Sequence, residues 1–217
     1  GRVLLKVKAG IPYSIPETVA IEPDASAASY FLSLPLVVGG SVTIKGLYSN
    51  SLQGDYGFTE VLKDIGMKIE ETETGTTASI PLKELPGSGV HQNFWPISDT
   101  FLTLAAISPL LKGPTQIEGI GHTRHQECDR IAAMASELIK LGQWVEDGED
   151  KLEIQPGLIT PSEVMTYHDH RVAMSFGILG CFNFYADGSP WLTIRDPGCC
   201  AKTFPEFFNL LDKLRTA

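Results

Sequence analysis

Two segments, residues 55–65 and 126–141, carry apolar residues at the three- and four-residue spacing of an amphipathic helix. Gly66 follows the first segment and Gly142 the second, and glycine commonly ends a helix because it adopts a left-handed backbone without cost. We therefore predict two helices that each pack on the core by one face. The apolar positions are Val61, Leu62 and Ile65 in the first helix and Ile131, Met134, Leu138 and Leu141 in the second.

Short apolar or alternating segments between turn residues predict strands, and segments rich in alanine, serine and leucine predict further helices. The predicted strands are residues 18–22, 41–46, 67–71, 77–82, 115–120, 143–147, 151–156 and 191–197. The further predicted helices are residues 25–34, 99–108, 170–181 and 204–214.

These elements repeat with a long period. Asp24, Asp99 and Asp169 each precede a predicted helix, and they are 75 and 70 residues apart. A fixed long period indicates a repeated supersecondary unit. We predict an α/β (α+β) fold of three βαβαββ units, of which the third lacks its closing pair of strands. Equivalent loops of such units gather on one face, so distant residues can meet there.

Composition narrows the class of protein. Apolar residues make up 43% of the 217 and charged residues 20%, no apolar run reaches membrane-spanning length, and no secretory signal opens the chain. The net charge of −9 argues against a nucleic-acid partner. No pair of cysteines has CxxC spacing, so neither a disulfide framework nor a zinc site is indicated, and we expect a cytoplasmic protein. The cysteines are Cys128, Cys181, Cys199 and Cys200.

The arginines are unevenly placed. Four of the six, Arg124, Arg130, Arg171 and Arg195, lie in or beside predicted loops of the second and third units. The planar guanidinium binds carboxylates and phosphates with two parallel hydrogen bonds, so a small anionic ligand is one interpretation. Ordinary surface ion pairs are the other.

Several loop residues fit either a role in a functional site or a purely structural role. Asp99 can act as the N-cap of its predicted helix. Glu127 and Arg130 share a helix face at spacing i, i+3, which fits a salt bridge as well as a site. Asp169, His170 and Arg171 together place an acid, an imidazole and a guanidinium at one helix N-terminus, where anions are favoured. His168 and His170 alone are weak evidence for a metal, and Lys202 lies at the start of the last helix.

Four segments together resemble EPSP synthase, the 3-phosphoshikimate 1-carboxyvinyltransferase family, over about residues 15 to 215. They are Asp24–Phe31 (DASAASYF), Ser51–Asp55 (SLQGD), Asp169–Met174 (DHRVAM) and Asp196–Pro205 (DPGCCAKTFP). The resemblance implies an enzyme of two similar domains with three βαβαββ units each. Residues 16–217 would be the C-terminal domain, and residues 1–15 a loosely packed junction toward an N-terminal half that is the missing partner. In the family, the first short segment of the full enzyme returns to complete the C-terminal domain.

The resemblance also implies roles for individual residues. Asp99 would bind the hydroxyls of shikimate 3-phosphate and act in proton transfer, and Glu127 would be the second acid or base, near the methylene carbon of phosphoenolpyruvate. Gln126 and His122 would contact shikimate 3-phosphate, although the family often has lysine and asparagine at these positions. The phosphoenolpyruvate site would consist of Arg130 and Arg171 on the carboxylate and Lys202 on the phosphate, supported by Asp169 and His170.

The implied reaction transfers the enolpyruvyl group of phosphoenolpyruvate to the 5-hydroxyl of shikimate 3-phosphate, in aromatic amino-acid biosynthesis, with no metal or organic cofactor. It would make the chain a relative of the target of glyphosate. We expect five charged side chains to line one concave face: Asp99, Glu127, Arg130, Arg171 and Lys202. We also expect the three cations among them to have few neutralising partners, and the isolated chain to be inactive. Two alternatives stay open: UDP-N-acetylglucosamine enolpyruvyl transfer and a non-catalytic domain of the same fold.

Overall fold

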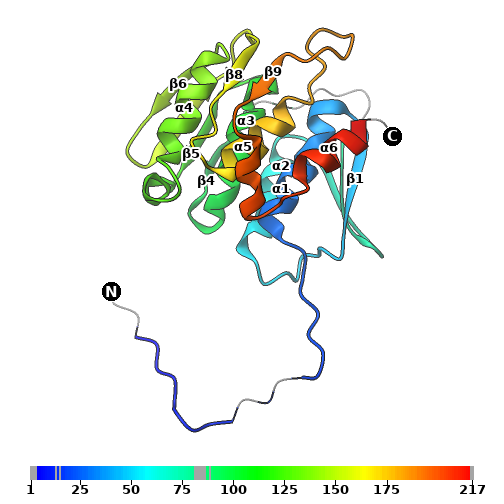
Figure 1. Ribbon diagram of the computed structural model, residues 1–217, viewed down its shortest axis with the longest axis vertical. Coiled ribbons are helices and arrows are strands. Elements are labelled where there is room, and N and C mark those ends of the chain that lie inside the picture. Colours follow the sequence, from blue (N-terminus) through cyan, green and yellow to red (C-terminus); the bar gives the residue numbers. More distant parts are fainter. Residues whose placement is uncertain (1–3, 13, 15, 81–86, 88, 216–217) are drawn as a thin grey trace.

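A computed structural model describes residues 4–12, 14, 16–80, 87 and 89–215. Three buried helices form its centre: α1 (Ala25–Val38), α3 (Phe101–Ile107) and α5 (His170–Leu179) pack against one another. Nearly all their side chains are buried, and all seven residues of α3 are. A helix that is apolar all round belongs in a core. The sheets and the remaining helices surround this centre (Figure 1).

The first two sheets are built alike. Antiparallel strands β1, β3 and β2 form the first sheet, and β5, β7 and β6 form the same arrangement in the second, where β4 adds a parallel edge strand. The strands are β1 (Ser41–Lys45), β2 (Lys68–Thr72), β3 (Gly75–Ser79), β4 (His91–Asn93), β5 (Thr115–Glu118), β6 (Trp144–Asp147) and β7 (Lys151–Gln155).

The third unit has a smaller sheet. Parallel strands β8 (Ser162–Val164) and β9 (Leu192–Ile194) flank α5, and α6 (Phe207–Arg215) follows. Within the described residues no closing hairpin follows α6, in contrast to β2–β3 and β6–β7.

The two amphipathic helices are confirmed with changed bounds. They are α2 (Phe58–Asp64) and α4 (Arg130–Lys140), and every side chain predicted to face the core is buried. Gly66 and Gly142 follow them with φ of +94° and +86°. The predicted start of α4 at residue 126 is wrong, because Asp129 has extended backbone and caps the helix by accepting a hydrogen bond from Ala132 N at 3.0 Å.

The predicted strand at residues 18–22 is wrong. In the second and third units the equivalent strands, β4 and β8, pair in parallel with β5 and β9, but residues 18–22 form no such ladder on β1. Val19 and Ile21 are exposed there. A strand needs a hydrogen-bonded neighbour and a face to bury its apolar side chains, and this segment has neither.

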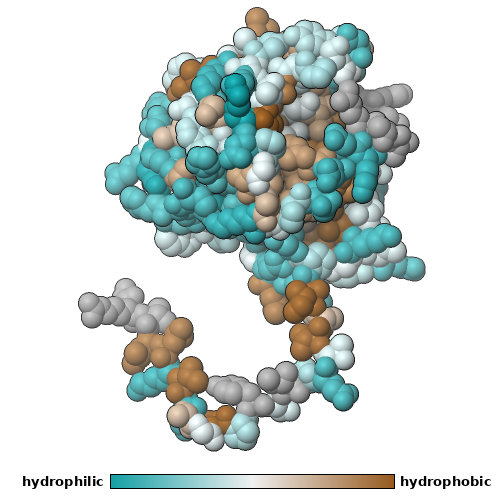
Figure 2. All heavy atoms as spheres, in the orientation of Figure 1, coloured by the Kyte–Doolittle hydropathy of each residue, from teal (hydrophilic) through white to brown (hydrophobic). Residues whose placement is uncertain are grey.

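Residues 4–12 form an extended arm that leaves the body of the molecule (Figure 1). Figure 2 shows much of this arm as apolar, and Leu4, Leu5 and Val7 are 76–86% exposed. That geometry is compatible with a junction segment. The N-terminal half toward which it would lead remains a prediction.

Smaller differences concern element ends. The helix predicted at 99–108 begins at Phe101 and the one at 204–214 begins at Phe207, just after Pro205. Helix α5 and strands β5 and β9 are shorter than predicted, and residues 81 and 82 of the predicted strand 77–82 lie outside the described residues. None of the helices in the described part of the chain has the length and apolar character needed to cross a membrane.

Candidate active site

Arg130 is the centre of a charged network. Its side chain is only 1% exposed, yet it lies at the first position of α4, directly after the capping Asp129. Nε donates to Asp169 Oδ2 at 2.7 Å, Nη1 to Asp99 Oδ1 at 3.0 Å, and Nη2 to Glu127 Oε2 at 2.8 Å. One guanidinium therefore joins three carboxylates from three separate loops.

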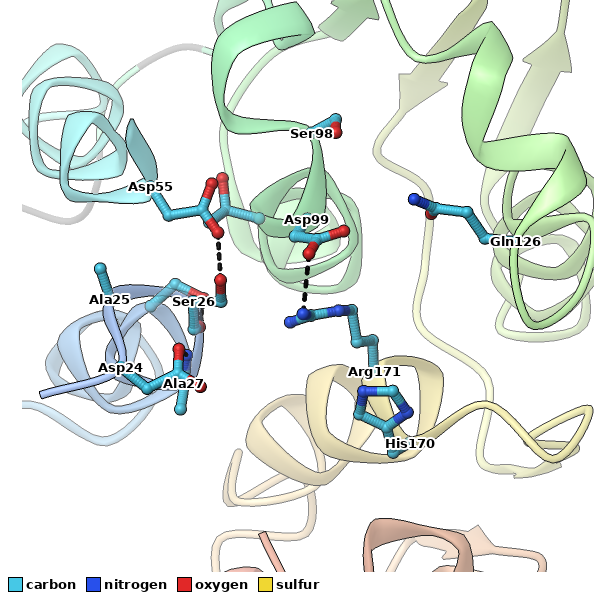
Figure 3. A network of polar contacts seen from close by, with 12 residues as sticks. Asp24, Ala25, Ser26, Ala27, Asp55, Ser98, Asp99, Gln126, His170 and Arg171 are labelled. Carbon is cyan, nitrogen blue, oxygen red and sulfur yellow. Dashed lines mark hydrogen bonds and ion pairs between the residues drawn. The ribbon is translucent and has the colours of Figure 1, made fainter. Parts of the chain in front are cut away.

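Asp99 links this arginine to a second one. Its other oxygen accepts a hydrogen bond from Arg171 Nη2 at 2.8 Å (Figure 3). Asp99 does not cap a helix as predicted: it lies inside the 3-10 helix Trp95–Thr100, and the N-cap position of α3 is Thr100. The backbone of Ile97 is non-helical, so the segment is kinked two residues before Asp99, and the Asp99 carboxylate binds both arginines.

Glu127 and Lys202 form the outer edge of the network. Lys202 Nζ donates to Glu127 Oε1 at 2.5 Å across 75 residues of sequence. This hydrogen bond, with the backbone amide of Glu127 and the Arg130 charge, lowers the pKa of Glu127 to about 2. Glu127 is therefore a carboxylate at neutral pH.

Asp169 and His170 lie beneath these groups. Asp169 is fully buried and caps α5, since its Oδ1 accepts a hydrogen bond from Arg171 N at 2.7 Å. His170 is also buried, and neither ring nitrogen has a hydrogen-bond partner. Burial is the main cause that lowers the pKa of His170, so its ring is neutral at pH 7. Asp169 thus bonds to the guanidinium of Arg130 and to the backbone amide of Arg171, whereas the His170 ring hydrogen-bonds to neither arginine.

The predicted residues His122 and Gln126 lie on one side of this network. Gln126 accepts a hydrogen bond from Arg130 Nη1, and His122 Nε2 lies 2.9 Å from Ser98 Oγ. The His122 ring also contacts the exposed Trp95 edge to face, with 4.9 Å between centroids. Gln126 therefore contacts the arginine that binds Asp99, and His122 contacts the residue before Asp99.

The arginines divide between the two interpretations left open by the sequence. Arg130 and Arg171 belong to the network. Arg124 instead pairs with Asp129 at 2.7 Å, and Arg195 pairs with Glu163 at 2.6 Å, where both side chains are largely exposed. The surface ion-pair interpretation therefore holds for Arg124 and Arg195, whereas an anionic ligand at Arg130 and Arg171 stays a prediction.

The expectation of poorly neutralised cations is wrong. Asp99, Glu127 and Asp169 neutralise the three cations, because folding brings acids together that are far apart in the sequence. A cavity of about 720 Å³ lies elsewhere, between α1, α5, β9 and α6. In this structure the network is a compact cluster of ion pairs rather than an empty cationic pocket.

Sequence reasoning missed the contribution of the first unit. Ser26 Oγ donates to Asp55 (Figure 3), and burial, opposed by Ser26, raises the pKa of Asp55. The charges of Asp99 and Arg171 also influence Asp55. The first unit therefore extends the cluster, and the SLQGD segment that carries Asp55 was the available signal.

Within the described residues no group of three or more histidine, cysteine or acidic side chains is arranged to hold a metal ion. All four cysteines are free. The cluster itself consists of carboxylates and cations, which are groups that bind anions and exchange protons.

Comparison with known proteins gives the family of this chain. The family model for EPSP synthase (3-phosphoshikimate 1-carboxyvinyltransferase) matches residues 6–211. Proteins named 3-phosphoshikimate 1-carboxyvinyltransferase from Opitutus terrae and Nostoc punctiforme are 53% and 43% identical over 97% and 94% of this chain. The chain covers 46% of each relative, so it spans about half the length of these proteins.

Solved structures give the same result. The EPSP synthase of Acinetobacter baumannii has a TM-score of 0.73 at 25% identity, over 89% of this chain and 46% of that one. The enolpyruvyl transferase NikO of Streptomyces tendae, with a TM-score of 0.66 at 18% identity, shares the fold. Because the family model covers nearly the whole chain and the fold agrees, the chain belongs to the EPSP synthase family.

Proposed function

We propose that this chain is one half of an enzyme that transfers the enolpyruvyl group of phosphoenolpyruvate to the 5-hydroxyl of shikimate 3-phosphate, giving EPSP and phosphate. The observation that carries the proposal is the network around Arg130, which gathers three cations and three acids from separate loops of a chain in this family. Its relatives are named for this reaction.

The cations would hold the anionic substrate. Arg130 and Arg171 both bind one carboxylate, Asp99, so their guanidinium groups are close enough to bind a substrate carboxylate together. Lys202, at the outer edge, would bind the phosphate as a point charge. These are the two anionic groups of phosphoenolpyruvate.

The acids would move the protons. Asp99 would accept the proton of the attacking hydroxyl while the methylene carbon of phosphoenolpyruvate is protonated, and phosphate would leave as a proton is removed. Glu127 is ionised in the ligand-free chain because Lys202 bonds to it. A substrate phosphate that binds Lys202 would weaken that bond and raise the pKa of Glu127, which would prepare this carboxylate for proton exchange.

The partner of this half would be the rest of the enzyme. The chain spans about half of its relatives, and we propose that it is the C-terminal domain, with residues 16–217 as the domain and residues 1–15 as the junction. The cavity of about 720 Å³ is lined largely by apolar residues of α1, α5, β9 and α6, with polar residues such as Asn183, Ser189 and Asp212 among them. We propose that strands from outside this chain fill it, and that the complete enzyme is cytoplasmic.

A steady-state assay of the complete enzyme tests the proposal. We expect turnover with shikimate 3-phosphate and none with UDP-N-acetylglucosamine as the acceptor. Turnover with UDP-N-acetylglucosamine alone would establish the other enolpyruvyl transfer, and no turnover with either acceptor would favour a binding domain. The intact mass of the gene product would decide whether the second half belongs to the same polypeptide.

A further inference from the structure

The segment that leads into α5 has an unfavourable backbone. Tyr167 and His168 have φ of +54° and +58°, and Asp169 N donates to Thr166 O at 2.8 Å, as in a type I′ turn. Such turns favour glycine and asparagine, because a side chain with a Cβ is strained in this conformation. Something outside the turn must therefore hold it.

Glu137 contacts this turn from α4. Its side chain is fully buried, although it carries a carboxylate. Oε1 accepts a hydrogen bond from Tyr167 OH at 2.5 Å, and Oε2 accepts one from Met165 N at 3.2 Å. Lys140 Nζ donates to both oxygens at 2.7 and 2.9 Å. The carboxylate thus binds the residue before Thr166 and the residue after it.

The turn leads directly to the candidate site. Asp169 follows it, accepts hydrogen bonds from Arg130 Nε and Arg171 N, and caps α5. Arg130 and Glu137 are seven residues apart on α4, which is two helical turns, so they lie on the same side of that helix. One helix therefore contacts the third unit at two points, through Arg130 to Asp169 and through Glu137 to Tyr167.

We propose that Glu137 is a positioning residue: by holding the left-handed turn Tyr167–His168 it fixes Asp169 and, through it, the orientation of Arg171. Glu137 is not itself among the residues predicted to bind a substrate. Burial and the Glu137 hydrogen bond raise the pKa of Tyr167 to about 12, so its hydroxyl remains a donor over the whole working range of pH. The effect on substrate rests on the proposed function, whereas the effect on the turn does not.

The test uses Tyr167→Phe and Glu137→Gln in the complete enzyme, with Leu62→Ala as a control. Leu62 is fully buried in α2, which packs on α1 and β2, so its truncation should lower stability without removing a contact of Glu137. Hydrogen exchange at the amides of Asp169 and Arg171 should accelerate in both test variants and keep its wild-type rank among the core amides in the control. Unchanged exchange in both test variants would overturn the inference.

The kinetic measurement separates positioning from stability. If Arg171 is correctly placed in only a fraction of molecules, the apparent affinity for its ligand falls by that fraction. We expect the KM for phosphoenolpyruvate to rise by roughly tenfold, the lower end of the range for the loss of one hydrogen bond to a charged group, with little change in kcat or in the KM for shikimate 3-phosphate. A KM for phosphoenolpyruvate equal to that of Leu62→Ala would show a purely structural role.

A rescue experiment addresses the turn itself. Adding His168→Gly to Tyr167→Phe should restore part of the lost affinity and protection, because glycine adopts positive φ without strain. The matched control is His168→Ala, which also removes the exposed contact between His168 and Asp196 but keeps a Cβ. Equal behaviour of the glycine and alanine variants would contradict the inference. If the wild-type enzyme does not use phosphoenolpyruvate, the proposed function fails, and exchange with rescue still decides the role of Glu137.

Discussion

Replacing Arg130 with methionine should strongly destabilise the chain. Methionine keeps an unbranched apolar stem but removes the guanidinium from all three carboxylates. Asp99 and Glu127 are 32% and 27% exposed and keep Arg171 and Lys202 as partners. Asp169 is fully buried and loses its charged partner on Oδ2. The cost therefore concentrates on one carboxylate.

Breaking a buried ion pair by removing one partner costs about 3–5 kcal/mol. For a chain of this size, each kcal/mol lowers Tm by roughly 2–4 °C, so we expect a decrease of roughly 10 °C. Urea unfolding followed by circular dichroism would measure the free energy, with Arg195→Met as the control. Arg195 pairs with Glu163 at 2.6 Å, but its side chain is 61% exposed, so this variant should lose much less stability than Arg130→Met.

The double variant Arg130→Met with Asp169→Asn tests the cause. Asparagine keeps an oxygen that can cap α5 but carries no buried charge. The double variant should be more stable than Arg130→Met alone, because the unpaired carboxylate is gone. If it is equally or less stable, or if Arg130→Met loses no more stability than Arg195→Met, the reasoning from the buried pair is refuted.

Three further predictions concern activity and pH. Arg171→Ala should leave the circular dichroism of the complete enzyme unchanged and lower kcat/KM for phosphoenolpyruvate at least about tenfold; a normal value excludes the clamp. The 217-residue chain alone should not turn over shikimate 3-phosphate, because positioning requires both halves; a rate near that of the complete enzyme overturns the half-site. Glu127, whose pKa falls from 4.5 to about 2 on folding, should stabilise the chain above pH 4.5 by about 1 kcal/mol after solvent screening. That stability is lost as pH falls toward 2, so Glu127→Gln should flatten the acid side of a urea-midpoint profile, and equal slopes would contradict the assignment.

Local pattern predicted much of the fold, because helices and caps depend on neighbouring residues. The apolar faces of α2 and α4 are buried as expected, and Asp24 and Asp169 cap α1 and α5. Residues 18–22 alternate as a strand does, but strand formation depends on a partner that pattern cannot supply. Asp99 looked like a cap, but the kink at Ile97 depends on packing around the 3-10 helix.

The residues of the charged cluster were predictable from the sequence, but the ion pairs that they form with one another were not. The loops that carry Asp99, Arg130 and Arg171 were identified from residue type and from the family resemblance. Their contacts join residues 31 and 72 positions apart, a separation at which spacing carries no information about distance. The neutralisation of the cations therefore emerged only from the folded chain.

The pairing has a consequence for how an anion enters. Because Arg130, Arg171 and Lys202 already hold the chain's own carboxylates, a carboxylate or phosphate that bound as proposed would exchange with Asp99 and Glu127 instead of filling vacant charge. Such an exchange replaces one ion pair by another, so the affinity should depend only weakly on ionic strength. Under the proposed function, the displaced acids would become free when the ligand arrives, and binding energy would prepare them for proton transfer. In the ligand-free chain the same acids are bound to the cations that the ligand would take.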